Sequence, residues 1–312
     1  MSASAVSSPA MTRDDLLGFV DRYIDALVSH DRSRLPCAPD IRFTENNVPL
    51  RLGQGLWGTV TGAGAHDIVM ADPVTGNAGF MGTMEESGRT VMVSARMKIA
   101  GDRVTELETV VLRKEAGYFM NPAGWNDAAS LLTTPLAAEE CVSREEMIRV
   151  VDIYFDTLIE AAGDAPPFDP ACNRLENGVT TTNNPTAFPQ AKDGPLAAAI
   201  TGLSAEAQFR LGMGKVITDI KDRRYTLIDA HTGLVFVQTF FHRDGTARVV
   251  PLTNGQSFTV ESPKDTPNSS VIGEIFKIRN GKILQIQALI MPVPYRTQSV
   301  WVSDRIEWPA QG

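Results

Sequence analysis

Two stretches of the chain carry apolar residues at the spacing of an amphipathic helix. In residues 12–29 the apolar positions are Leu16, Phe19, Val20, Tyr23, Ile24 and Leu27. In the stretch that starts at Ser143 they are Met147, Val150, Val151, Tyr154, Phe155 and Leu158. Thr12 stands three residues before Asp15, and Ser143 three before Glu146, which is the capping-box arrangement. Each half of the chain is therefore predicted to begin with a helix that has one apolar face.

Strand periodicity follows the first helix. In residues 91–98 the side chains alternate, so that one face carries Val91, Val93, Ala95 and Met97. Residues 104–112 are predicted to place a second set on one face, namely Val104, Glu106, Glu108 and Val110. The two segments are predicted to be antiparallel strands of one sheet.

The sequence repeats itself. Adding 131 to each number aligns residues 12–48 with residues 143–179 without a gap, and the identical pairs include Arg13/Arg144, Asp21/Asp152, Tyr23/Tyr154, Glu45/Glu176 and Asn46/Asn177. Residues 66–88 resume the match at an offset of 157, and residues 98–109 at an offset of 179. We interpret this as a tandem duplication with two insertions in the second copy, near residues 180–222 and 246–270.

The offsets also divide the chain into domains. Residues 1–11 lack a basic start and a continuous apolar segment, so they are interpreted as a disordered tail and not as a signal peptide. The first domain is assigned to residues 12–135 and the second to residues 140–312. Long insertions are commonly lids or partner-binding arms, and plain surface decoration is the alternative. A short helix is predicted in the first insertion, from Ser204 to Leu211.

Composition narrows the functional classes. Hydrophobic residues make up 43% of the 312 positions and charged residues 21%, which is typical of a soluble globular protein. A net charge of −8 without clustered Lys and Arg argues against a nucleic-acid partner. No apolar run approaches 18 residues, so no membrane span is predicted, and the expected location is cytoplasmic. The three cysteines have neither disulfide-framework nor metal-site spacing.

A helix followed by a bent sheet, repeated once, resembles the nuclear transport factor 2-like superfamily, which includes SnoaL-like polyketide cyclases and ketosteroid isomerases. More narrowly, the chain is similar to an uncharacterised tandem family common in fungi. The resembling segments are Thr44-Glu45-Asn46-Asn47, Arg96-Met97-Lys98-Ile99, Glu106-Leu107-Glu108-Thr109-Val110-Val111, Cys172-Asn173-Arg174-Leu175-Glu176-Asn177-Gly178 and Arg223-Arg224-Tyr225. The resemblance implies an α+β fold of two tandem cone-shaped domains, each an N-terminal helix packed on a strongly bent antiparallel sheet.

In such a cone the helix and the concave face of the sheet enclose an apolar pocket, where desolvation raises the pKa of a carboxyl group and suits it to acid–base catalysis. Glu45 and Glu108 are the candidate acid and base in the first copy, and Arg96 is expected to stabilise an oxyanion. Asn46 and Tyr23 are candidates to hold the substrate. The structural alternatives are a cross-strand salt bridge between Arg96 and Glu108, a loop-capping role for Glu45, and a core position for Tyr23.

The second copy differs at two of these positions. At an offset of 179, Gln287 corresponds to Glu108 and Ile275 to Arg96, so both charges are missing. The second copy has polar candidates of its own, so a site there, or one shared between the copies, stays open. The further substrate-binding candidates are Trp57, His66, Tyr154, Glu176, Asn177 and Arg224.

Other catalytic templates are missing. The sequence has no G-x-S-x-G elbow, phosphate loop or HExxH motif. We therefore expect a cofactor-independent lyase or isomerase, without a metal, that acts on a small hydrophobic or aromatic molecule by elimination or by retro-aldol-type loss of water or formaldehyde. The alternatives are a non-catalytic ligand-binding or assembly module and a polyketide cyclase-like enzyme. The expected assembly is a monomer that acts as an internal pseudo-dimer, or a homodimer. An interior filled by Phe43, Trp57 and Met97 would favour the binding module.

Overall fold

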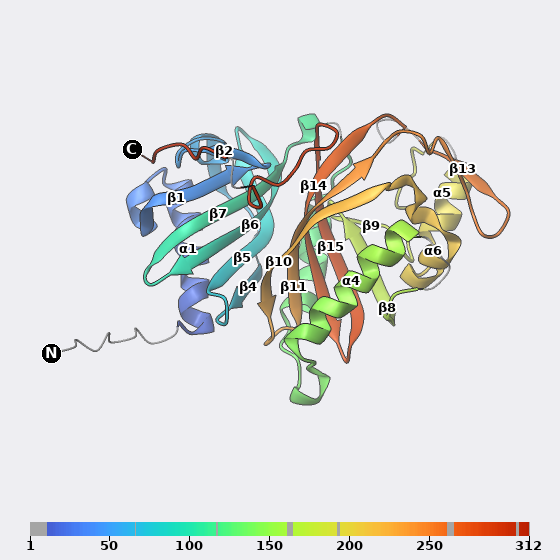
Figure 1. Ribbon diagram of the computed structural model, residues 1–312, viewed down its shortest axis with the longest axis horizontal. Helices are drawn as coiled ribbons and strands as arrows, with labels where there is room; N and C mark the ends of the chain where they lie inside the picture. Colours follow the sequence, from blue (N-terminus) through green and yellow to red (C-terminus); the bar gives the residue numbers. More distant parts are fainter. Residues whose placement is uncertain are drawn as a thin grey trace.

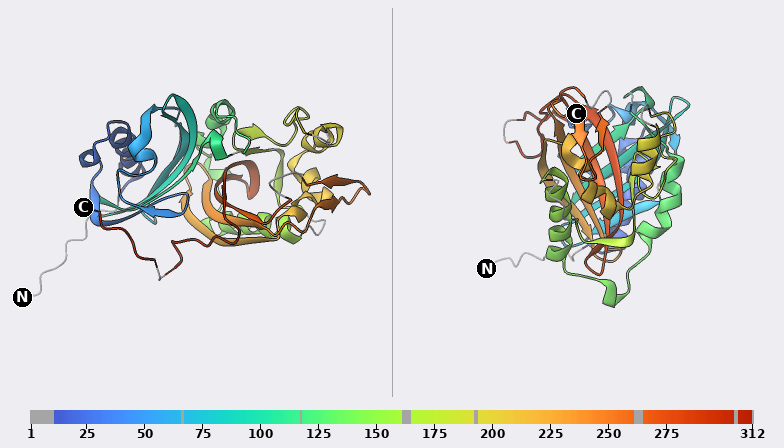
Figure 2. Two further views of the ribbon diagram at one scale, coloured as in Figure 1. Left: turned by 90° about the horizontal axis from the view of Figure 1, so that it is seen from above. Right: turned by 90° about the vertical axis from the view of Figure 1, so that its right-hand side faces the viewer.

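The computed structural model describes residues 11–65, 67–116, 118–160, 165–191, 194–260, 265–303 and 306–311, apart from the side chains of residues 126 and 127. The described chain is α+β and contains a seven-stranded sheet, a six-stranded sheet and a small two-stranded sheet. The two large sheets are curved and stand side by side, each with a long helix on its outer side (Figures 1 and 2).

The first half builds the seven-stranded sheet in the order β2-β1-β7-β6-β5-β3, with β4 paired to β5. Its elements are α1 (Arg13–Val28), η1 (Arg32–Arg34), β1 (Cys37–Glu45), β2 (Val48–Leu50), α2 (Leu56–Thr59), β3 (Val60–Ala63), β4 (Ile68–Asp72), β5 (Asn77–Glu86), β6 (Arg89–Ala100), β7 (Arg103–Leu112), η2 (Lys114–Ala116) and α3 (Ala123–Thr133).

The second half builds the six-stranded sheet in the order β10-β11-β14-β15-β8-β9. Its elements are η3 (Ala138–Glu140), α4 (Arg144–Glu160), β8 (Phe168–Glu176), β9 (Val179–Thr180), α5 (Gly194–Thr201), α6 (Ala205–Leu211), η4 (Met213–Val216), β10 (Asp219–Asp229), β11 (Leu234–Arg243), β12 (Val249–Pro251), β13 (Ser257–Thr259), β14 (Asn268–Arg279) and β15 (Lys282–Val293).

The two predicted helices are present and bury the predicted apolar faces. At the start of α1 the Thr12 hydroxyl and the Asp15 carboxylate cap each other's backbone amides, so the capping box is complete. At the start of α4 the Ser143 hydroxyl accepts from the amide of Glu146, 3.2 Å away. Each helix packs its apolar face on one sheet and forms one hydrophobic core, with Tyr23 in the first and Tyr154 in the second.

The expectation of wholly antiparallel sheets is wrong at one strand in each half. β1 pairs with β7 in parallel, and β8 pairs with β15 in parallel. Because β1 follows helix α1 and enters beside the last strand of its sheet, its direction is not set by a hairpin. The strands at residues 91–98 and 104–112 are antiparallel neighbours, as predicted.

A β-bulge changes which residues share a face of β7. The register between β6 and β7 shifts between Lys98 and Ile99, so Val104 is paired with Ile99 and lies in the core beneath α1. Glu106 and Glu108 pair with Lys98 and Arg96 on the opposite face. The predicted grouping of Val104 with the two glutamates is therefore wrong, because the extra residue of a bulge reverses the alternation.

The faces of the two sheets that point away from α1 and α4 pack against each other through one apolar cluster, which includes Met81 and Val110 of the first sheet and Phe236 and Ile275 of the second. Two reciprocal clamps flank this cluster. Arg13 is ion-paired with Asp229 at 2.8 Å, and Asp229 accepts from the amide of Ala71 at 3.1 Å.

The second clamp repeats these contacts with the halves exchanged. Arg144 is ion-paired with Asp72, and Asp72 accepts from the amide of Ile228 at 3.0 Å. A contact in which residue i of one unit meets residue j of the other, and j meets i, has the form of a two-fold interface.

The insertions and the chain end add to this frame. The predicted helix after Ser204 is α6, and the Ser204 hydroxyl caps it by accepting from Ala207. The two insertions pack on each other through a small apolar cluster that includes Ile200, Leu211 and Val250. The C-terminal segment leaves the second half and crosses back to the first sheet (Figure 1), where Val300 donates its amide to Asn47 at 3.0 Å.

Candidate active site

The second half holds a buried group of polar side chains between α4 and its sheet. On the face of the sheet toward α4, Glu176 of β8, Ala288 of β15 and Glu274 of β14 form one cross-strand row. Arg174 lies two residues before Glu176 on the same face of β8, because side chains alternate along a strand. Tyr154 of α4 packs on the same core, with its ring 5.0 Å from that of Phe276.

Glu274 is the most unusual member of this group. Its residue is 3% exposed, and its Oε2 has no hydrogen-bond partner among the described residues. Burial raises the pKa of Glu274 to about 8, and nearby Glu176 also raises it, while Arg174 and a hydrogen bond with Tyr154 lower it. At neutral pH the carboxyl group is therefore mostly protonated, so it can donate a proton or a hydrogen bond.

Arg174 connects the group to its cover. Its Nη2 donates to Glu176 at 2.8 Å and its Nη1 donates to Gln208 of α6 at 3.2 Å, while its Nε has no partner among the described residues. Burial lowers the pKa of Arg174, but the neighbouring Tyr154 and the acidic groups raise it by more. The pKa of Arg174 is therefore raised above its ordinary value. The guanidinium is thus a permanent cation in an apolar interior.

Helix α6, from the first insertion, closes this interior. Phe209 lies 5.1 Å from Tyr154 and 5.1 Å from Phe168, measured between ring centroids, and 5.7 Å from the Arg174 guanidinium. The space left between α6, α4 and Arg174 is about 10 Å³, which is room for about one water molecule. A larger ligand can reach Arg174 only if α6 moves.

The corresponding interior of the first half is filled. Phe43 stands where the second half has Arg174, and Ala95 where it has Glu274. Tyr23, Phe43 and Trp57 are each at most 3% exposed, and the Trp57 ring lies 5.6 Å from Tyr23 and 6.5 Å from Phe43. Burial raises the pKa of Tyr23, so its hydroxyl stays protonated. Trp57, expected to contact substrate, is a core residue of this packed interior.

Glu45 and Glu108 do not share a pocket, contrary to expectation. Thr44 is paired with Glu108, so Glu108 lies on the face of Thr44 and Glu45 lies on the other face of the sheet. Glu45 accepts from the amide of Leu56 at 2.6 Å and is ion-paired with Arg113 at 2.8 Å. These contacts match the capping alternative, because Leu56 is the first residue of α2. The catalytic role of Glu45 stays a prediction.

Glu108 and Arg96 instead lie between the two halves. Arg96 donates to Glu108 at 3.2 Å, and Arg224 of β10 donates to both oxygens of Glu108 from the second half. The Trp301 ring covers this cluster, 5.0 Å from the Arg96 guanidinium. The structure therefore brings together three of the predicted residues, in a cross-strand salt bridge extended across the interface, and their role in catalysis stays a prediction.

The two repeated asparagines bind backbone. The Asn46 side chain accepts from the amide of Val111 at 2.7 Å and donates to its carbonyl at 3.0 Å. Asn177 does the same with Ile290, at 2.7 and 3.3 Å. Both have a positive φ, 52° and 48°, which asparagine tolerates better than most residues. Their amides are thereby engaged in fixing the turn after β1 and β8. His66 lies outside the described residues.

Glu274 is the residue that the sequence reasoning missed. Along β14 the positions facing α4 are Ile272, Glu274, Phe276 and Ile278, so one acid interrupts an apolar row. Projecting the duplication from Ala95 to Glu274 would have placed that acid in the second interior. The alternation of β14 is therefore the sequence signal for this acid.

Larger hollows lie outside these interiors. One of about 500 Å³ lies between α3 and the strands β8, β9 and β15, and the described side chains that line it are uncharged. Another, of about 720 Å³, is lined by polar side chains that include Asp219, Asp222 and His242. Among the described residues, no group of three or more His, Cys, Asp and Glu is placed to hold a metal ion.

No helix in the described part of the chain combines the length and apolarity needed to cross a membrane.

The chain is only weakly similar to known proteins. A family model described as "Domain of unknown function (DUF8021)" matches residues 140–290. No curated protein matches the chain. A de novo designed protein with a curved β-sheet has 15% identity and a TM-score of 0.26, covering 48% of this chain and 88% of its own. A putative SnoaL-like polyketide cyclase from Jannaschia sp. CCS1 has 13% identity and a TM-score of 0.25, covering 50% and 90%.

Proposed function

We propose that the protein is a cofactor-independent enzyme that moves a proton on a small, largely apolar organic molecule, with its active site in the interior of the second half. The observation that carries this proposal is Glu274, a buried carboxyl with one oxygen free of partners, beside the Arg174 cation. Acids whose pKa is perturbed by burial beside a specific charge partner cluster at functional sites.

Two carboxyl groups in different environments divide the work of acid and base. Glu274 is mostly protonated at neutral pH and donates to a substrate oxygen, together with the Tyr154 hydroxyl. Glu176 is ion-paired with Arg174 at 2.8 Å and accepts a proton from a carbon next to that oxygen. By analogy, ketosteroid isomerases use a neutral buried carboxylic acid beside a tyrosine for the same purpose.

The charge that develops on the substrate is an enolate or phenolate oxyanion. Arg174 offers its unpartnered Nε and the permanent charge of its guanidinium to that anion. Collapse of the enolate with loss of a β-hydroxyl, which leaves as water with a proton from Glu274, gives a lyase, and return of the proton to another carbon gives an isomerase. In retro-aldol loss of formaldehyde, Glu176 instead takes the proton of a β-hydroxyl, the C–C bond breaks, and the enolate that results takes up a proton. A polyketide cyclase-like reaction is the alternative enzyme class, because it begins with the same deprotonation.

The first half has a different proposed role. Its interior has Phe43 and Ala95 at the positions of Arg174 and Glu274, which favours a non-catalytic module. The reciprocal clamps Arg13–Asp229 and Arg144–Asp72 favour a duplicated pair that imitates a dimer within one chain. In this proposal the first half supports the sheet of the second half and takes no part in the reaction.

The test is a screen of phenols and polycyclic ketones for protein-dependent exchange of carbon-bound hydrogen in D₂O, followed by NMR. For a compound that exchanges, Glu274→Gln is expected to slow the rate by roughly 10²–10⁴-fold, the usual contribution of a positioned proton donor. Glu106→Gln, a half-buried glutamate outside the interior, is the matched control and should keep the rate. Unchanged exchange in Glu274→Gln, or an equal loss in Glu106→Gln, would overturn the assignment.

A further inference from the structure

The uncharged groove between α3 and the edge of the second sheet has the construction of a second ligand site. Its volume of about 500 Å³ lies within the range of small-molecule sites. Asn173 and Arg174 are neighbours in β8 and point to opposite faces of the sheet, so the groove and the interior with Glu274 are separated by the strand.

The walls of this groove are fixed in place. At one end of α3, Asn121 donates its amide to Asn177 at 2.8 Å, and Gly124 lies so close to Gly178 that a Cβ on Gly124 would come within 2.0 Å of the Gly178 oxygen. At the other end, the buried Lys277 ammonium donates to the carbonyl oxygens of Leu132 at 3.2 Å and Thr134 at 2.6 Å. Because these contacts fix α3 at both ends, the helix cannot move closer to the sheet and fill the groove.

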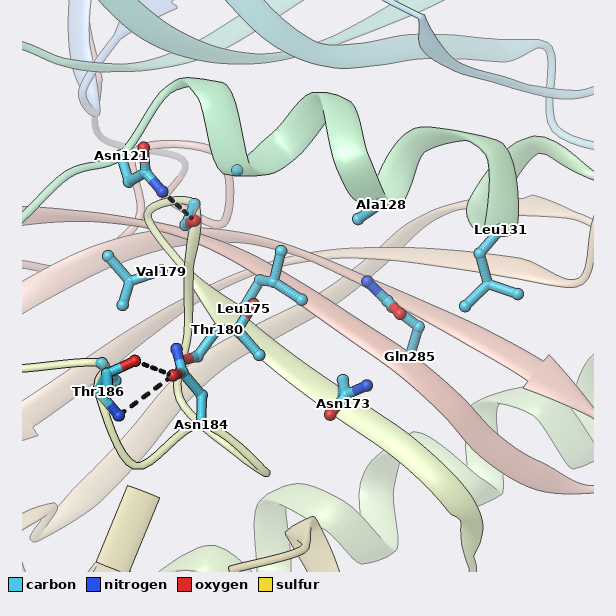
Figure 3. Close-up of a pocket in the computed structure, with 13 residues that line it drawn as sticks. Asn121, Ala128, Leu131, Asn173, Leu175, Val179, Thr180, Asn184, Thr186 and Gln285 are labelled. Carbon is cyan, nitrogen blue, oxygen red and sulfur yellow. Dashed lines mark hydrogen bonds between the residues drawn. The ribbon is translucent and has the colours of Figure 1, made fainter. Parts of the chain in front are cut away.

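The floor of the groove carries two side-chain amides that are open to a ligand. Gln285 is 4% exposed and points from β15 toward Ala128 of α3 (Figure 3). Its side-chain amide has no hydrogen bond among the described residues. Asn173, its cross-strand partner, uses its oxygen to accept from Asn183 at 2.8 Å and keeps its Nδ2 donor. Because the Gln285 amide opens into the groove and makes no hydrogen bond to the described part of the protein, it is available to bond a ligand there.

The first half shows what covers the same position. By the offsets, Arg42 corresponds to Asn173 and Glu106 to Gln285, and Arg42 and Glu106 are likewise cross-strand partners. There the C-terminal segment lays the Trp301 ring 5.2 Å and the Trp308 ring 5.5 Å from the Arg42 guanidinium. In the first half, aromatic rings therefore cover the face of the sheet that corresponds to the open groove of the second half.

We propose that the groove over Gln285 and Asn173 binds a neutral aromatic ring that carries hydrogen-bonding groups on its edge. The amides supply both donors and acceptors, which match hydroxyl or carboxamide groups. None of the described side chains that line the groove is charged, so a carboxylate or phosphate finds no counter-charge among them. Ala128, Leu131 and Val179 provide the apolar contact for the ring faces.

A matched pair of probes tests the charge preference. We expect 4-hydroxybenzamide to bind the full-length protein saturably in ligand-detected NMR and calorimetry. The isosteric anion 4-hydroxybenzoate is expected to bind at least about tenfold more weakly, because its desolvated charge is unpaired in the groove. Equal or stronger binding of the anion, or no saturable binding of the amide, would overturn the proposal.

Variants locate the bound ring. Gln285→Leu should weaken the binding of 4-hydroxybenzamide by roughly tenfold, because the ligand loses one hydrogen bond. The same variant should not lower Tm, since the Gln285 amide has no partner among the described residues. Ala128→Trp should abolish binding by filling the groove. Ser130→Ala, on the exposed side of α3, is the control and should bind normally. Binding that survives both groove variants but is lost in Glu274→Gln would place the ring in the interior and refute this site.

Discussion

The two interiors of this chain are built on the same frame and filled in opposite ways. Both lie between an N-terminal helix and a curved sheet, and each contains a buried tyrosine from that helix, Tyr23 or Tyr154. In the first, Phe43 and Trp57 complete an apolar core. In the second, Arg174 and Glu274 take positions that correspond to Phe43 and Ala95. Well-packed apolar groups stabilise a fold more reliably than buried charges do, so the second interior is retained at a cost in stability.

Exchange of single residues between the interiors gives the largest expected effect. Arg174→Phe copies Phe43 but leaves Glu274 and Glu176 without their cation, so it should reduce the free energy of unfolding by about 3–5 kcal/mol. The double variant Arg174→Phe/Glu274→Ala completes the copy and should recover most of that loss. Chemical denaturation measures both. A double variant that is no more stable than the single one would contradict the comparison.

The pH dependence of stability should distinguish the two interiors next. The pKa of Glu274 is raised to about 8 from its ordinary value of 4.5, so between these values the folded protein holds a proton that the unfolded chain releases. Stability therefore falls as pH rises through this window, by up to about 1.4 kcal/mol per pH unit from this group.

The control for that slope is again a glutamate variant. Glu274→Gln should remove the slope between about pH 5 and 8. Burial raises the pKa of Glu106, but Arg96 and Arg42 lower it by more, so the stability that this glutamate contributes is present at neutral pH and is lost only at more acid pH. Glu106→Gln should therefore lower stability at neutral pH and leave the slope between about pH 5 and 8 unchanged. Thermal unfolding across the pH range measures this, and an unchanged slope in Glu274→Gln would count against a protonated Glu274.

The reciprocal clamps should respond alike. Asp72→Asn and Asp229→Asn each weaken one buried ion pair and one bond to a backbone amide of the other half, so each should cost about 1–3 kcal/mol. Denaturant midpoints of the two variants give the comparison. A large effect in one and none in the other would show that the contacts between the halves are not equivalent.

The tyrosines give the smallest expected difference. Tyr154→Phe loses a hydroxyl beside Glu274 and Arg174, whereas Tyr23→Phe loses one in an apolar core. We expect Tyr154→Phe to cost about 1 kcal/mol more than Tyr23→Phe, the net value of one hydrogen bond. Paired melting curves measure this, and equal costs would indicate that Tyr154 is only a packing residue.

The sequence predicted the local elements well because their signals are local. Both long helices carry periodic apolar faces and capping hydroxyls, and the alternation of Val91, Val93, Ala95 and Met97 places those side chains in the core beneath α1, as found. The parallel entry of β1 and the bulge before Ile99 were missed. Both depend on pairing between strands distant in sequence, which no residue string reports.

The candidate site was predicted less well, for a related reason. The face of a sheet on which a residue lies decides its chemistry, and Glu108 lies on the face that meets the second sheet. The Glu108 carboxylate is therefore ion-paired with Arg96 and Arg224 and does not line a pocket beneath α1. Tyr154 and Glu176 are identified through the repeat, while their partner Glu274 belongs to the part of β14 before Lys277, where the two copies share no identities.

The return of the C-terminal segment to the first sheet has a consequence for synthesis. Trp301 covers Arg42 and Arg96, and Glu106 is separated from it by about 195 residues of later sequence. At roughly 5–20 residues per second, a ribosome takes about ten to forty seconds to make that stretch. During this time the first sheet lacks its tryptophan cover and the whole second sheet, so the nascent first half exposes both an apolar and a charged face. We expect it to need a holding chaperone until the last strands arrive.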